Sequence, residues 1–277
     1  MRRMLLTGLG MVLLFTVLSI VYTFVVLGIG QGVLSHQANG SLVTNAQGQV
    51  VGSSLLAQGF SDDKGNPLPR YFQPRPSEGS SGSNPYDPTF SGSLSLGPTN
   101  PKLIGFVPGV SIIDGNGQLV KGPDGKVLAT NPFATPTDPY CVPVDAKGNP
   151  VTQSLSTPSS GVGDPKQYAM NSDGSYQCDP NTVPERALAY RALNGLAAGA
   201  PVPVDAVTVA FSGLDPDISI WNAQLQTARV AQARNLPAST VAALVERYTT
   251  PRSLGILGEP GVNVLELNLA LDRLPKS

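Results

Sequence analysis

The 277-residue sequence has few of the residues on which catalysis most often depends. It contains one histidine, His36, and two cysteines, Cys141 and Cys178. A single histidine close to a hydrophobic segment excludes Ser-His-Asp and Cys-His arrangements around a core histidine. No Cys and His cluster has zinc spacing, and neither a Walker glycine loop nor the Asp-Lys-Thr-Gly motif of a phosphorylated ion pump occurs. We therefore expect a binding or assembly module rather than a hydrolase.

Charged residues are also scarce. They make up 13% of the chain, whereas about a quarter is usual for globular proteins. Lys and Arg number 18 and Asp and Glu number 19, so the net charge is -1. Because a protein binds nucleic acid through clustered basic residues, this balance argues against that partner. The 30 Gly and 26 Pro predict many turns instead.

One long hydrophobic run lies close to the N-terminus. Residues 5–29 carry no charge, and a helix of that length measures about 37 Å, enough to cross a hydrocarbon core of about 30 Å. The alternative is a cleaved signal peptide, whose apolar region usually has about 7 to 15 residues and ends at a small-residue cleavage site. Neither feature fits well, so we predict a transmembrane helix.

The charges beside this run predict its orientation. Arg2 and Arg3 precede it, and no Lys, Arg, Asp or Glu occurs from Met4 to Ser61. Basic residues beside a membrane span tend to stay in the cytoplasm. We predict a single-pass protein of the cell (inner) membrane, with residues 1–4 in the cytoplasm and everything after the span outside.

The extracytoplasmic part is predicted to be one α+β domain interrupted by a loop-rich insertion. Residues 30–104 form its first part, residues 105–183 the insertion and residues 184–277 its second part. Two short strands around a turn are expected within residues 42–56, and loop from residue 61 onward, where Tyr71, Phe72, Arg75 and Pro76 stand close together. Two or three helices on a small mixed sheet would complete the domain.

Periodicity and capping residues predict five elements after Thr182. They are a helix at residues 184–193 capped by Thr182, a strand at 204–211, a helix beginning at Asp215 and Pro216, a helix at 238–248, and a central strand at 262–271. The second helix would place Ile218, Trp221, Leu225 and Ala228 on one face. The last strand would place Leu265, Leu267, Leu269 and Leu271 on one side. The core would then combine the C-terminal third with the early strands.

Both cysteines lie within the predicted insertion. An oxidising compartment permits a disulfide between Cys141 and Cys178, which on the chain-entropy model contributes about 4 kcal/mol. The alternative is two free thiols. The turn at residues 114–117 lacks the spaced oxygens and closing Glu of an EF-hand, and residues 118–120 and 126–128 could form a hairpin around a second turn.

Two glycine-containing runs are candidates for holding an anion against backbone N-H groups. They are residues 91–98 and Phe211-Ser212-Gly213-Leu214-Asp215, and the second would lead directly into a helix N-terminus. Asp215, however, places a negative charge where a phosphate would sit. Asp215 and Asp217 could do acid-base work, although carboxylates at a helix start more often cap it.

Further motifs, in their order along the chain, resemble those of KdpC, the C subunit of the bacterial Kdp potassium-transporting P-type ATPase. In the first half they are Gln37-Ala38-Asn39-Gly40-Ser41-Leu42, Gly52-Ser53, Gln58, Phe60, Tyr71-Phe72, Arg75-Pro76-Ser77 and Leu96-Gly97-Pro98-Thr99-Asn100-Pro101. In the second half they are Val202-Pro203, Asp205, Val207-Thr208, Ser212-Gly213-Leu214-Asp215-Pro216, Arg229-Val230-Ala231, Ala233-Arg234, Gly258-Glu259-Pro260, Val262-Asn263 and Leu267-Asn268-Leu269-Ala270-Leu271-Asp272. The resemblance covers the chain apart from about residues 105–183.

The resemblance implies a non-catalytic subunit of a four-part membrane complex. Its partners would be a channel-like potassium-binding subunit, an ATP-hydrolysing pump subunit and a small peptide. Family members are said to assist assembly and to act as a catalytic chaperone that raises the pump subunit's affinity for ATP. The resemblance assigns nucleotide contact to Ser212, Gly213, Leu214, Asp215 and Gln226, with ATP shared with the pump subunit and no covalently bound cofactor.

This nucleotide role conflicts with the predicted topology, because ATP is cytoplasmic and the domain should lie outside. The charges flanking the span lead us to the hypothesis that the domain covers the extracellular potassium entrance. The sequence departs from the family pattern at residues 91–95, at Phe211 and in the insertion. Two alternatives stay open, a stand-alone membrane-anchored extracytoplasmic binding protein and an enzyme with an unfamiliar site.

Overall fold

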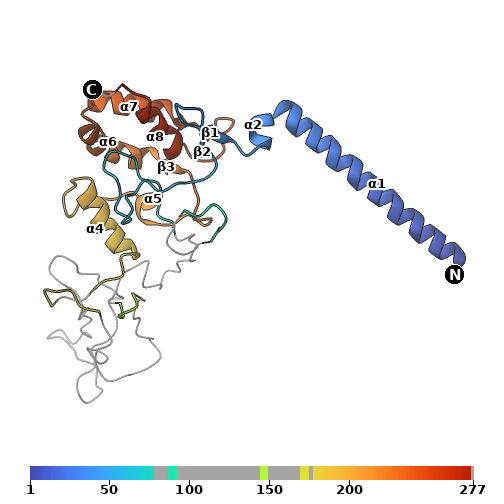
Figure 1. Ribbon diagram of the computed structural model, residues 1–277, viewed down its shortest axis with the longest axis horizontal. Coiled ribbons are helices and arrows are strands. Elements are labelled where there is room, and N and C mark those ends of the chain that lie inside the picture. Colours follow the sequence, from blue (N-terminus) through green and yellow to red (C-terminus); the bar gives the residue numbers. More distant parts are fainter. Residues whose placement is uncertain (78–85, 93–143, 149–168, 175–176, 276–277) are drawn as a thin grey trace, which may run out of the picture. The chain divides into compact units, whose positions relative to one another are not determined.

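The computed structural model describes residues 1–77, 86–92, 144–148, 169–174 and 177–275 (Figure 1). The chain divides into two compact units, Met1–Leu56 and Ala57–Ser277. The hairpin predicted at residues 118–120 and 126–128 and the turn at residues 114–117 lie outside the described residues.

The first unit begins with the long helix α1, Arg2–Val33, in which no residue is buried. Among the described residues, α1 is the one helix long and apolar enough to cross a membrane. It ends at Leu34, and the single turn α2, Ser35–Ala38, follows. The predicted helix at residues 5–29 is therefore present and a few residues longer at each end. The orientation inferred from Arg2 and Arg3 stays a prediction.

A small hairpin completes the first unit. β1, Leu42–Thr44, pairs antiparallel with β2, Val50–Ser53. The Oδ1 atom of Asn45 closes the connection by accepting hydrogen bonds from the backbone N-H groups of Gln47 and Gln49. The two strands expected within residues 42–56 are confirmed.

The second unit is built from five helices and three short strands among its described residues. They are α4 (Val183–Leu193), α5 (Val204–Val207), β3 (Asp217–Ser219), α6 (Ile220–Arg234), α7 (Ala238–Arg247), β4 (Thr249–Thr250), β5 (Gly261–Asn263) and α8 (Val264–Asp272). The strands form an antiparallel sheet in the order β3-β5-β4. The α+β class is confirmed, although two small antiparallel sheets replace the single mixed sheet that we expected.

The core of the second unit lies where α6, α7 and α8 meet the sheet (Figure 1). Its buried members are Phe72, Ile218, Ala223, Val230, Ala231, Val241, Val245, Val262, Val264, Leu267 and Leu271. The predicted helix at residues 238–248 is confirmed as α7. The early part of the chain supplies Phe72 to this core, whereas β1 and β2 belong to the other unit, so their predicted place in the core was wrong.

The helix predicted at residues 184–193 is confirmed as α4. Thr182 caps it as expected, because its side-chain oxygen accepts a hydrogen bond from the backbone N-H of Glu185 at 3.2 Å. Pro184 lies in the first turn, where its missing N-H costs no hydrogen bond. The chain leaves the helix through Gly195, whose φ of +63° suits a glycine.

The strand predicted at residues 262–271 was wrong beyond Asn263. Only Gly261–Asn263 pairs, as the central strand β5, and α8 begins directly afterwards. The side chain of Asn263 caps α8 by accepting from the backbone N-H of Glu266 at 3.1 Å. Alternate leucines suggested a period of two, but the deeply buried residues Val264, Leu267 and Leu271 follow helical spacing.

Two further predicted elements were wrong between residues 204 and 228. Residues 204–207 form the short helix α5 rather than a strand, since Thr208 N-H donates to the carbonyl of Val204 at 2.9 Å. The next helix starts at Ile220 and is capped by Ser219, not by Asp215, because β3 comes first and pairs with β5. Its buried face contains Ala223 and Val230 among others, whereas Trp221 and Ala228 are exposed.

Candidate functional site

The extended segment from Tyr71 to Pro76 runs through the second unit and is held there by two side-chain amides. Asn268, on α8, accepts from Phe72 N-H at 2.9 Å and donates to the Phe72 carbonyl at 2.9 Å. Gln226, on α6, does the same for Gln73, at 2.7 Å and 3.1 Å. We call Gln226 and Asn268 the amide clamp. Its four hydrogen bonds satisfy buried backbone groups that a neighbouring strand would otherwise satisfy.

Gln226 has no spare hydrogen-bonding position in this arrangement. Its Oε1 atom also accepts from Arg229 Nη2 at 2.7 Å, and its Nε2 atom also donates to Asn222 Oδ1 at 2.9 Å. An amide side chain offers two donor hydrogens and two acceptor lone pairs. All four are therefore used within the fold.

Arg229 is buried beside the clamp and binds neutral oxygen atoms only, among the described residues. Its guanidinium donates to Asn194 Oδ1 at 2.9 Å and to the carbonyls of Pro69 and Tyr71 at 2.6 Å and 2.9 Å, in addition to Gln226. Burial lowers the pKa of Arg229 to about 10. The group thus stays protonated at neutral pH and joins the early segment to α4 and α6.

A second polar cluster fixes the start of α6. Asp205 accepts from the backbone N-H of Ser219 at 2.7 Å, from its hydroxyl at 2.9 Å and from Asn222 Nδ2 at 2.9 Å. Asn222 Oδ1 in turn accepts from the Tyr190 hydroxyl at 2.8 Å. Because Asn222 also binds Gln226, this cluster and the amide clamp form one continuous network.

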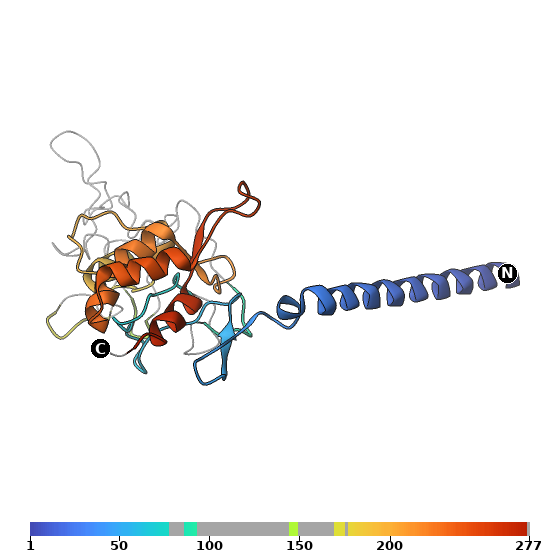
Figure 2. The same cartoon turned by 90° about the horizontal axis from the view of Figure 1, so that it is seen from above.

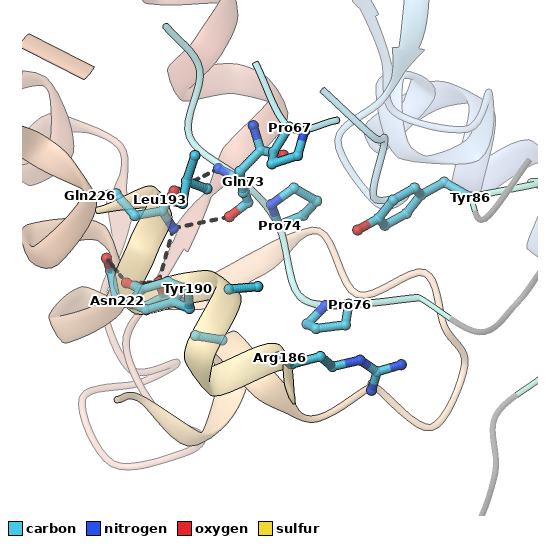
Figure 3. Close-up of a pocket in the computed structure, with 12 residues that line it drawn as sticks. Pro67, Gln73, Pro74, Pro76, Tyr86, Arg186, Tyr190, Leu193, Asn222 and Gln226 are labelled. Atoms are coloured by element: carbon cyan, nitrogen blue, oxygen red, sulfur yellow. Dashed lines mark hydrogen bonds between the residues drawn. The ribbon is translucent and has the colours of Figure 1, made fainter. Parts of the chain in front are cut away.

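A pocket of about 200 Å³ opens next to this network (Figure 3). It is lined by Pro67, Gln73, Pro74, Pro76, Tyr86, Arg186, Ala189, Tyr190, Leu193, Ala206, Asn222 and Gln226. Figure 3 shows Gln226, Asn222 and Tyr190 gathered at one side of it, with Arg186 and Tyr86 farther away. Pockets for drug-sized ligands usually measure about 300 to 1,000 Å³. This one lies below that range, so it suits a small group or a ring better than a whole nucleotide.

The predicted run Ser212 to Asp215 does not line this pocket. The Ser212 carbonyl accepts from Gly92 N-H at 3.1 Å and from the Ser91 hydroxyl at 3.2 Å, so the two glycine runs singled out in the sequence meet here. Leu214 is buried, and its carbonyl accepts from Ala57 N-H at 2.9 Å. Gly213 has a φ of +73°, which only glycine adopts without strain. These contacts fix the loop to early segments of the chain.

Asp215 has a structural partner rather than a helix to cap. Its carboxylate forms an ion pair with Arg75 at 2.9 Å and accepts from the backbone N-H of Asp217 at 3.1 Å. Because β3 separates this loop from α6, the loop does not lead directly into a helix N-terminus, contrary to our expectation. Burial, and next the nearby Asp215 carboxylate, raise the pKa of Asp217.

The pocket offers little acid-base chemistry at neutral pH. Burial raises the pKa of both tyrosines that line it, Tyr86 and Tyr190, so that their hydroxyls stay protonated. In the described part of the chain, no three His, Cys, Asp or Glu side chains are grouped to hold a metal ion. The arrangement therefore suits recognition or rigidity better than bond cleavage.

Only one of the two cysteines of the predicted disulfide lies within the described residues. Cys178 is disulfide-bonded, but Cys141 lies outside the described residues, so the pairing stays a prediction. Arg229 and Asn268 belong to the sequence motifs quoted above, where they had no assigned role, and the structural role of Asn222 was not predicted. Polar residues at helical spacing within apolar helices, facing the same side as core residues, were the signal for buried hydrogen-bonding side chains.

Comparisons with known proteins match nearly the whole chain. The sequence model of the family described as KdpC, "K+-transporting ATPase, c chain", matches residues 5–110 and 152–273, so the unmatched stretch is shorter than residues 105–183. A protein of Mycobacterium tuberculosis named "Potassium-transporting ATPase KdpC subunit" is 38% identical over 275 residues, which cover 99% of this chain and 100% of that protein. Proteins of the same name from Allorhizobium ampelinum and Streptomyces coelicolor are 35% and 34% identical, covering 95% and 98% of this chain and 92% and 93% of their own.

Proposed function

Because the chain belongs to the KdpC family of potassium-transporting ATPase subunits, we propose that it is a non-catalytic accessory subunit that assists assembly of the potassium uptake complex. Its partners would be the potassium-binding channel-like subunit, the ATP-hydrolysing pump subunit and the small peptide subunit. The observation that carries this proposal is α1, an apolar helix with no buried residue, ahead of a compact domain. Such a helix can dock against membrane-embedded partners.

We also propose that the domain lies outside the cytoplasm and covers the extracellular potassium entrance. Arg2 and Arg3 support this orientation, since they are the cations nearest to the uncharged run at residues 5–29. A reporter fused after residue 277 should be active on the extracytoplasmic side and silent in the cytoplasm. Replacing Arg2 and Arg3 with Ser should mix the two orientations. Reporter activity in the cytoplasm alone would overturn the proposed topology.

Copurification separates assembly from the alternative of a stand-alone binding protein. The tagged full-length chain, extracted from native membranes, should bring down the other subunits together with potassium-stimulated ATP hydrolysis. Purification of the chain by itself would favour the stand-alone alternative.

We propose further that the effect on ATP affinity passes through the pump subunit by assembly rather than by contact between this chain and the nucleotide. Three observations support this view. Gln226 uses all its hydrogen-bonding positions within the fold, the Ser212–Asp215 loop leads into β3 rather than into a helix, and the pocket is small for a nucleotide. Nucleotide contact at these residues stays a prediction, which one comparison of variants can test.

The comparison uses the two halves of the amide clamp. Gln226→Ala and Asn268→Ala each release one backbone segment, but only Gln226 lines the pocket. In the assembled complex, we expect both variants to change the ATP concentration for half-maximal hydrolysis by the same factor. The exposed neighbour Gln224 provides the control Gln224→Ala, which should change nothing. A rise of about tenfold for Gln226→Ala alone, equivalent to about 1.4 kcal/mol of binding, would establish direct nucleotide contact.

A further inference from the structure

The segment between β4 and β5 presents three large apolar side chains to solvent. Every residue from Pro251 to Glu259 is exposed, and Figure 2 shows the segment as a narrow loop that projects away from the helices of its unit. Leu254, Ile256 and Leu257 are 89%, 76% and 57% exposed. We call these three residues the apolar tip. Apolar clusters that stay in water usually mark an interaction site.

The loop that carries the apolar tip is internally ordered. Ser253 and Leu257 exchange two backbone hydrogen bonds, at 2.8 Å and 2.9 Å. Below them, Arg252 and Glu259 form an ion pair at 2.6 Å. Leu254 has a φ of +54°, a left-handed conformation that is uncommon for a bulky residue. The fold thus holds the tip in one shape and accepts backbone strain in doing so, which is typical of binding segments.

The charge of the loop indicates what kind of surface it meets. Residues 253–258 carry no charge, and the pair at the base is neutral overall. A loop that binds a lipid surface usually carries Lys or Arg for anionic headgroups and Trp or Tyr for the interface. Residues 253–258 contain none of them, and Arg252 at the base of the loop is paired with Glu259. A neutral, apolar hollow on a protein is therefore the complementary surface.

The tip is too small to support a dimer of this chain by itself, because stable interfaces bury about 800 Å² on each partner. It suits a local anchor within a larger assembly. We propose that the apolar tip inserts into a neutral apolar pocket on another subunit of the potassium-transporting ATPase. This inference rests on the proposed function, since it requires the assembled complex.

Site-specific photo-crosslinking in native membranes tests which molecule contacts the apolar tip. The full-length chain would carry a photoreactive amino acid in place of Ile256, with Phe211, 88% exposed elsewhere on the unit, as the control position. We expect a protein adduct with another ATPase subunit from position 256 and a much weaker one from position 211. Adducts with lipid alone, or with a second copy of this chain, would overturn the proposal.

Substitutions can separate an effect of the apolar tip on partner binding from an effect on the stability of the fold. Leu254→Gly removes the side chain and suits the positive φ, so the free subunit should be at least as stable while its retention of partners falls by about tenfold. Ile256→Ser should weaken retention in the same way, and Phe211→Ser should not. If the unaltered chain copurifies with ATPase subunits and the tip variants do so equally well, this inference alone fails. If the unaltered chain copurifies with none, the proposed function fails.

Discussion

Replacing Arg229 with methionine should lower the free energy of unfolding by about 3 to 5 kcal/mol, because four oxygen atoms each lose one hydrogen-bond donor in a buried environment. These are Asn194 Oδ1, Gln226 Oε1 and the carbonyls of Pro69 and Tyr71. Methionine keeps most of the packing volume and supplies no donor. Since domains are stable by only about 5 to 15 kcal/mol, we also expect poor accumulation of the assembled complex.

Denaturant unfolding of the detergent-solubilised chain provides the measurement. Trp221 is the only tryptophan and lies on α6, so its fluorescence reports on the helix that carries Arg229. Arg229→Lys should rescue little, because an ammonium cannot reproduce the planar fork of the guanidinium. Arg247→Met, at an exposed position of α7, is the matched control and should change stability by less than about 0.5 kcal/mol. A loss below about 1 kcal/mol for Arg229→Met would mean that water replaces the guanidinium.

Asn268→Leu should lower the free energy of unfolding by about 2 to 4 kcal/mol, since the buried N-H and carbonyl of Phe72 both lose their partner. Within the described part of the chain, both groups bind only this side chain, and Phe72 itself is fully buried in the core. Leucine has a similar shape, so lost hydrogen bonding rather than a cavity accounts for the effect. The same fluorescence measurement applies.

Asn268→Asp gives this prediction a pH dependence with a definite sign. A protonated carboxyl can donate to the Phe72 carbonyl and accept from its N-H, as the amide does, whereas a carboxylate cannot donate. Burial should therefore raise the pKa of the introduced carboxyl above its unfolded value of about 3.9. Relative to the unaltered protein, the variant should be least destabilised below that value and lose stability as pH rises toward the folded-state pKa. A deficit that does not change between acidic and neutral pH would contradict the role given to Asn268.

Several helices were predicted correctly from residues within or directly beside them. Thr182, Pro184 and Glu185 marked the start of α4, and the apolar spacing of residues 238–248 marked α7. The uncharged run near the N-terminus gave α1. In each case, the signal lay within a few residues of the element that it predicted.

The wrongly predicted elements have two causes, an ambiguous spacing of apolar residues and strand pairing between distant parts of the chain. The leucines at alternate positions from 265 to 271 fit a strand, but Val264 completes a helical stripe with Leu267 and Leu271, and only packing against α7 and the sheet selects it. Asp215 and Pro216 looked like a helix start, yet pairing of Asp217 with Asn263 of β5 extends the chain first. That pairing joins residues 46 positions apart, so no local pattern reports it.

The sequence by itself determined the long apolar helix α1, the α+β class and the KdpC family, because hydrophobic length, capping residues and ordered motifs are local properties. Only the tertiary structure decided what the motifs do. It placed Gln226 and Asn268 on the backbone of Phe72 and Gln73, and Arg229 on the carbonyls beside them. These contacts span more than 150 residues, and a buried amide or guanidinium takes its role from whichever unpaired backbone groups the fold brings to it.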